Sequence, residues 1–146
     1  MEKSELSELV AQLYAALHLL SGYPVPETLP RVVTMPKAAL QNLICDRPCQ
    51  VRAVYFPALG VLVDDALNLR GSEYDRSIVL HELVHHAQER AGRFETLPSN
   101  CQRRAASEDE AYQIQNRYLM NKAQEPMRMP RFGLACGDEG STPPVR

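Results

Sequence analysis

Hydrophobic residues recur at intervals of three and four positions in several stretches of the chain, a spacing that places them on one face of a helix. The pattern predicts long helices over residues 4–20, 73–91 and 103–123. The second is apolar almost all round in its middle and is followed by Gly92, a residue that commonly ends helices. A shorter helix is expected over residues 36–44, where a proline occupies the first turn.

Shorter runs rich in branched and aromatic residues predict strands over residues 31–35, 50–56 and 61–64. A short glycine-containing loop, residues 57–60, separates the last two runs. Two strands joined in this way are typical of an antiparallel hairpin, which we expect over residues 50–64.

The composition supports one folded domain. Of the 146 residues, 45% are hydrophobic and 23% charged, which is enough to bury one sizeable core. We expect an α+β domain over residues 1–123, in which the small antiparallel hairpin packs on the 73–91 helix and the 103–123 helix follows. Residues 124–146 contain four prolines and three glycines and are expected to form an extended C-terminal tail.

The charge pattern excludes two classes of partner. The net charge is −2, whereas domains that bind nucleic acid or anionic membranes are usually basic. No apolar run approaches the length needed to span a membrane. The N-terminal stretch carries Glu2, Glu5 and Glu8, so it is not expected to be a signal peptide.

The chain has four cysteines, Cys45, Cys49, Cys101 and Cys136, which allow two disulfides or four free thiols. The spacing of the first two is C-x3-C, which departs from the C-x2-C pattern of a structural zinc site. A Cys45–Cys49 bridge would close a small loop, and a Cys101–Cys136 bridge would tie the tail to the 103–123 helix. Two disulfides would indicate a periplasmic or secreted protein whose signal has been removed, and reduced thiols a cytoplasmic one.

The stretch IVLHELVHHAQ, residues 78–88, carries the most specific chemistry. His81 and His85 lie one helical turn apart, so their imidazoles can converge on one ion, and Glu82 can face the same space without being a ligand. Two imidazoles and a carboxylate can hold zinc and leave a position for water, whose proton the adjacent glutamate can accept. The alternative is a core helix that merely contains histidines, but buried histidines and a buried glutamate are costly unless something satisfies them.

Residues 78–87 resemble the active-site helix of the zincin metallopeptidases, in which an apolar frame surrounds H-E-x-x-H. The resemblance implies a minimal zincin-like domain that binds Zn²⁺. The chain departs from the metzincin pattern, because Gln88 and Ala91 stand where that pattern has glycine and a third histidine. The only histidine outside this helix is His18, which we expect on a partly buried helix face.

The gluzincin branch takes its third ligand from a glutamate on a later helix, commonly in an E-x-x-A-D pattern, and the chain is similar to it at Glu108 and Ala111. Glu108 projects from the middle of an apolar arc and Glu110 from beyond its edge, so helical periodicity favours Glu108 over Glu110 as the ligand. Tyr112 stands where the aspartate usually supports a ligating histidine. It either supports the histidine through its hydroxyl or points at the substrate.

These features predict a zinc-dependent metallopeptidase of gluzincin type that acts on a peptide or protein. Zinc would be held by His81, His85 and Glu108, Glu82 would be the general base, and the 50–64 hairpin would supply an edge strand for substrate. The candidates for stabilising the oxyanion are Tyr74, His86, Tyr112 and Tyr118.

Two other classes of protein stay open. One is a zinc-binding, non-catalytic binding or regulatory domain with a vestigial peptidase site, and the other is a metal-free helical interaction domain. The presence of Glu82 argues against the first, because a purely structural site needs no base.

Overall fold

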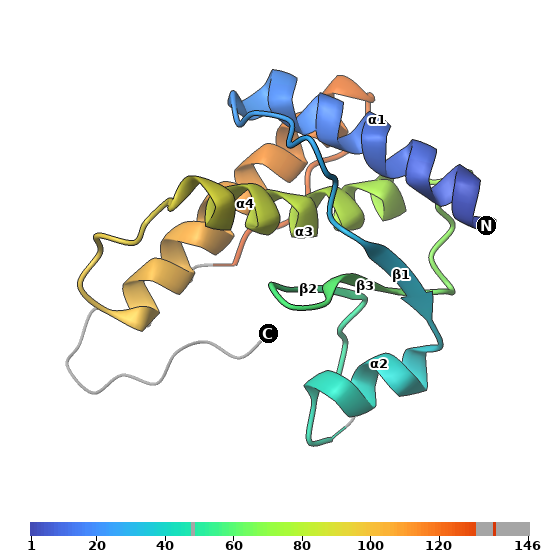
Figure 1. Cartoon of the computed structure of the whole chain (residues 1–146), viewed down its shortest axis with the longest axis horizontal. Coiled ribbons are helices and arrows are strands. Elements are labelled where there is room, and N and C mark those ends of the chain that lie inside the picture. The colour runs from blue at the N-terminus through green and yellow to red at the C-terminus, as the bar shows by residue number, and fades with distance from the viewer. Residues whose placement is uncertain (48, 131–135, 137–146) are drawn as a thin grey trace.

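The computed structural model describes residues 1–47, 49–130 and 136, and within them it shows four helices and three strands (Figure 1). In chain order the elements are α1 Lys3–Ser21, β1 Val32–Met35, α2 Lys37–Ile44, β2 Ala53–Phe56, β3 Gly60–Asp64, α3 Glu73–Ala91 and α4 Asn100–Asn121. The predicted α+β class and each of the predicted elements are confirmed.

The sheet has the strand order β1-β3-β2. The predicted hairpin is confirmed, since β2 pairs antiparallel with β3. The sheet as a whole is mixed, because β1 pairs with β3 in parallel. Gly60 allows the three strands to meet: its φ is +90°, and a side chain there would collide with the carbonyl of Arg31, which accepts a hydrogen bond from the Val61 N–H at 2.8 Å.

Helix α3 is the central helix of the fold. It contacts α1, α4, β2 and β3, and Figure 1 shows it crossing the middle of the molecule between α1 and the sheet. Its apolar residues Val79, Leu80, Leu83 and Val84 are completely buried in the main core, together with leucines from one face of α1. The all-round apolar pattern of this segment therefore reflects contacts on several sides.

Side chains at the helix ends fix where α3 and α4 begin. The Ser72 hydroxyl accepts a hydrogen bond from the Asp75 N–H at 3.1 Å, which caps α3, and Gly92 ends the helix in the left-handed conformation. Helix α4 begins three residues before its predicted start. The reason is that Ser99 caps it by accepting from the Gln102 N–H, a pattern that hydrophobic periodicity does not reveal.

Both predicted disulfides, Cys45–Cys49 and Cys101–Cys136, are present. Such bonds are typical of proteins that fold in an oxidising, extracytoplasmic environment. Among the helices of the described ranges, none has the length and apolar character needed to cross a membrane.

The beginning of the predicted tail is packed against the domain. Residues 124–130 form no regular element, but the backbone of Met127 exchanges two hydrogen bonds with the Asn116 side chain, at 2.7 and 3.1 Å. The rest of the predicted tail, residues 131–135 and 137–146, lies outside the described residues.

Two leucines on α1 provide a matched test of this packing. Leu17 is completely buried and Leu19 is 84% exposed. Replacing a buried leucine with alanine leaves a cavity, so Leu17→Ala should lower the free energy of unfolding by about 2–5 kcal/mol. Leu19→Ala should change it by less than about 0.5 kcal/mol. Urea denaturation of both variants measures the difference, and equal losses would contradict the placement of α1.

Candidate metal centre

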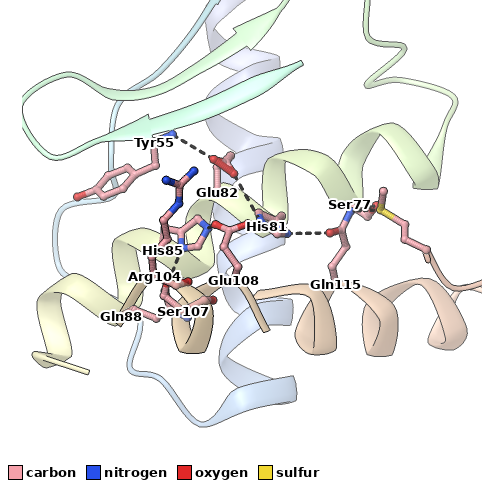
Figure 2. A network of polar contacts seen from close by, with 11 residues as sticks. Tyr55, Ser77, His81, Glu82, His85, Gln88, Arg104, Ser107, Glu108 and Gln115 are labelled. Carbon is pink, nitrogen blue, oxygen red and sulfur yellow. Dashed lines mark hydrogen bonds and ion pairs between the residues drawn. The ribbon is translucent and has the colours of Figure 1, made fainter. Parts of the chain in front are cut away.

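Four buried polar side chains from two helices meet at the contact between α3 and α4 (Figure 2). His81, Glu82 and His85 come from α3 and Glu108 comes from α4, and each is at most 8% exposed. One ligand atom from each of His81, His85 and Glu108 can be chosen so that all three lie within 4.8 Å of one another. These three residues therefore form a buried group that could bind a metal ion.

The sequence of α4 allows this close approach. Ala105 and Ala111 lie three residues before and after Glu108, and both are buried. Because their side chains are small, α4 can approach α3 closely enough for Glu108 to reach both histidines. Its two carboxylate oxygens lie 3.4 Å from His81 Nε2 and 2.5 Å from His85 Nε2.

Gln88 orients His85. The amide nitrogen of Gln88 donates hydrogen bonds to the Ser107 carbonyl at 2.9 Å and to a Glu110 carboxylate oxygen at 3.1 Å. Both of these partners accept only, so the amide oxygen of Gln88 is the atom that faces His85 Nδ1, at 2.9 Å. Nδ1 must then carry a proton and donate a hydrogen bond to the Gln88 amide oxygen, and the Nε2 atom is the one that faces Glu108.

Gln115 orients His81 by the same logic. Its amide nitrogen donates to the Ser77 hydroxyl at 3.0 Å, and that hydroxyl in turn donates to the Tyr74 carbonyl at 2.6 Å. The amide oxygen of Gln115 consequently faces His81 Nδ1 at 2.9 Å, as Figure 2 shows. Nδ1 of His81 is again the protonated nitrogen, and Nε2 faces Glu108.

The orientation of His81, His85 and Glu108 suits the binding of a metal ion. In the neutral tautomers set by the two glutamines, His81 and His85 direct Nε2 lone pairs at the same place as the Glu108 carboxylate. Without a cation, an imidazole can satisfy Glu108 only by taking up a second proton, whereas a divalent cation satisfies all three groups at once. Amide oxygens that hold the outer nitrogens of metal-binding histidines are a common supporting arrangement.

The ionisation of Glu108 agrees with this picture. Burial acts to raise the pKa of its carboxyl group, but without a cation the protonated imidazoles of His81 and His85 donate hydrogen bonds to it, and these bonds and their charges outweigh burial and hold the pKa below its usual range. The carboxylate is therefore negatively charged in the folded protein, which is the form that binds cations.

Glu82 lies beside the group. One of its carboxylate oxygens accepts a hydrogen bond from the Tyr55 N–H of β2 at 3.2 Å, and the other lies 3.9 Å from His81 Nε2. Its carboxylate thus lies between the sheet and the three candidate ligands, as Figure 2 shows. This position beside the two histidines is the one that the helical spacing predicts for Glu82.

The structure places Glu110, the other candidate ligand, outside the group. Its carboxylate accepts hydrogen bonds from the hydroxyl of Tyr23 and from Gln88, and it pairs with Arg93 at 3.5 Å. Glu110 therefore helps to orient Gln88 by accepting a hydrogen bond from its amide nitrogen, while Glu108 is the acidic residue that contacts both histidines.

Of the four candidates for stabilising the oxyanion, Tyr112 is the one whose ring lies against the group. Its ring centroid is 4.5 Å from that of His81. The Tyr118 hydroxyl instead donates to Glu73 at 2.5 Å. Tyr74 is 42% exposed, and its backbone carbonyl is the group that takes part in the network. The side chain that faces His81 Nδ1 belongs to Gln115, three residues beyond Tyr112.

The two remaining histidines lie elsewhere. Nδ1 of His86 is 2.9 Å from the Tyr14 hydroxyl, and its ring packs edge-on against Tyr14 and Tyr55. His18 is exposed, and its Nδ1 lies 2.7 Å from the Tyr23 carbonyl. The expectation that His18 lies on a partly buried face is wrong, because the buried face of α1 is formed by residues such as Leu13, Tyr14 and Leu17.

The fold and this group define a small α+β domain with a buried His-His-Glu cluster suited to a metal ion. The chain belongs to the family described as Domain of unknown function (DUF6647), whose model matches residues 2–128. The matched region contains all three candidate ligands and the two glutamines that orient the histidines, Gln88 and Gln115. No curated protein and no solved structure matches the chain.

The orienting role of Gln115 can be tested against an exposed glutamine on the same helix. On the sequence-based hypothesis that the group binds zinc, Gln115→Ala should weaken zinc binding by about 10–100-fold, because His81 loses the acceptor that fixes its tautomer. Gln115→Glu keeps an acceptor and should retain most of the affinity. Gln113→Ala, at an exposed position, is the control. Calorimetric titration with zinc measures all three, and unchanged affinity in Gln115→Ala would contradict the role.

The choice of Glu108 is tested by metal content. Glu108→Ala should purify without zinc, because two histidines alone bind it weakly. Glu110→Ala should keep about one zinc per chain, with reduced affinity because Gln88 loses a partner. Elemental analysis of protein purified without chelator distinguishes these results. Loss of zinc from the Glu110 variant alone would reverse the assignment.

Proposed function

We propose that this domain is a zinc-dependent metallopeptidase in which His81, His85 and Glu108 bind zinc and Glu82 is the general base. One observation carries the proposal: two histidines with oriented Nε2 atoms and a buried carboxylate converge, and a second carboxylate lies beside them. A site that served only to bind metal would need three ligands and no adjacent base.

The chemistry divides between the ion and Glu82. Zinc bound there would supply a Lewis acid that polarises a peptide carbonyl and increases the acidity of water. Glu82 would accept a proton from the water molecule that attacks the carbonyl carbon, and would donate it to the nitrogen as the C–N bond breaks. The Tyr55 N–H that binds one oxygen of Glu82 would keep the carboxylate oriented for this transfer.

The edge of β2 supports an extended peptide as substrate. The Asp64 N–H donates to the Arg52 carbonyl at 2.9 Å, which sets the alternation of hydrogen bonds along the antiparallel pair. The backbone groups of Ala53 and Tyr55 therefore point away from β3, toward the free edge of the sheet. The Tyr55 N–H, which donates to Glu82, already lies on this edge. A peptide added there as a further strand would lie next to Glu82.

One observation favours the second candidate, a zinc-binding domain that does not cleave peptides. The hydrogen bond from Tyr55 to Glu82 links the sheet to α3, so Glu82 also has a structural role. In such a domain Glu82 would hold the sheet in place and the metal would hold α4. The peptidase would lose its hydrolytic activity when Glu82 is changed, whereas the non-catalytic domain has no such activity to lose.

Glu82→Gln separates the two. In a peptidase the variant should keep about one zinc per chain and lose about 10²–10⁴-fold in the rate of hydrolysis, because an amide cannot accept the proton. Glu89→Gln makes the same change at an exposed position of α3 and should cleave like the wild type. Mass spectrometry of a mixture of synthetic peptides after incubation measures cleavage. A zinc-bound wild type that cuts none of them would support the non-catalytic domain.

A further inference from the structure

Arg104 is a basic residue on the ligand-bearing side of α4. It precedes Glu108 by four residues, which is about one helical turn, so the two side chains leave the same side of the helix. Arg104 is partly buried. Figure 2 shows its side chain extending from α4 past His85, with the guanidinium pointing toward Tyr55 and Glu82.

No partner engages this guanidinium within residues 1–47, 49–130 and 136: it makes no hydrogen bond and no ion pair there. Neighbouring arginines are engaged. Arg103 donates to the Leu97 carbonyl at 2.6 Å, and Arg93 pairs with Glu110. Partial burial removes water from a charged group, and such a group normally gains an acceptor in return. The guanidinium of Arg104 is thus available to a ligand.

The charge of the site specifies what that ligand carries. The carboxylates of Glu82 and Glu108 together balance the charge of one divalent cation, and the histidines are neutral in the tautomers described above. Arg104 then leaves one uncompensated positive charge at the site. A ligand group with a single negative charge would neutralise it. Because a guanidinium presents parallel N–H donors, a carboxylate is the group whose geometry it matches best.

We propose that Arg104 binds a carboxylate of the substrate and makes the site selective for peptides that carry one. This inference rests on the proposed peptidase function for its substrate class. The carboxylate is supplied by the free C-terminus of a peptide or by an acidic side chain. Each source is a carboxylate with two oxygens, and peptides that carry only one of the two kinds distinguish them.

The test measures binding, so that it does not depend on cleavage. The probes are N-acetyl-Ala-Ala, its C-terminal amide, and N-acetyl-Ala-Asp amide. They are titrated calorimetrically into the full wild-type chain and into the Arg104→Gln variant, with and without zinc, and mass spectrometry after each titration shows whether the probe is intact. Arg117→Gln is the matched control, since Arg117 is an exposed arginine on the same helix.

At least one acidic probe should bind about tenfold or more tightly than the neutral amide, as expected for a charge-assisted pair. Arg104→Gln should abolish this preference, Arg104→Lys should keep part of it, and Arg117→Gln should leave it unchanged. Preference for N-acetyl-Ala-Ala identifies the C-terminal carboxylate as the source, and preference for N-acetyl-Ala-Asp amide identifies the side chain.

Two results would overturn the inference: equal binding of the three probes, or an acid preference that survives in Arg104→Gln because the carboxylate binds zinc alone. A third result separates the inference from the proposed function. If the chain binds no zinc or cleaves nothing, but it still prefers the acidic probes and this preference depends on Arg104, the proposed peptidase function is wrong and the carboxylate site is supported.

Discussion

Burial of His81, His85 and Glu108 is the constraint on which the rest of the structure depends. Polar groups that lose water must regain every hydrogen bond or charge partner inside the protein, and an unpaired one costs several kcal/mol (about 2–7). The fold meets this demand at the contact of two helices. Small residues on α4 permit the approach, the leucines and valines of α3 supply the surrounding core, and α1 and the sheet pack against other sides of α3.

The side-chain amides of Gln88 and Gln115 orient the two buried imidazoles. The amide oxygens of Gln88 and Gln115 each accept a hydrogen bond from a histidine, and their amide nitrogens donate hydrogen bonds to atoms that can accept them. The two chains of hydrogen bonds end at the carbonyls of Tyr74 and Ser107, which belong to the backbones of α3 and α4. The orientation of the imidazoles is therefore set by the helices themselves and not by loops, which favours a rigid site.

Much of this arrangement is predictable from local pattern, because helix spacing determines which residues share a face. The position of His81 beside His85 and the inward direction of Glu108 follow from periodicity, and the cap at Gly92 follows from the residue type. The parallel pairing of β1 with β3 does not, because it joins segments that are distant in the chain. The roles of Gln88 and Gln115 depend on which atoms of α3 and α4 meet. Helical spacing places Gln88 on the face of His85 and Gln115 on the face of Glu108. Which histidine each glutamine binds is known only from the contact between the two helices.

The Cys101–Cys136 bond closes a covalent ring of chain that contains Glu108, while His81 and His85 lie outside it. With a sequence separation of 35, such a closure lowers the entropy of the unfolded chain by an amount worth about 4 kcal/mol. A metal bound between His85 and Glu108 would close a second ring, fused to the first along residues 101–108. The disulfide restrains α4 against residue 136, whereas the metal would restrain it against α3, so when the metal leaves α4 is still joined to α3 by the short segment of residues 92–99. Rebinding of the metal then becomes a local search within a short tether and not a refolding of the domain.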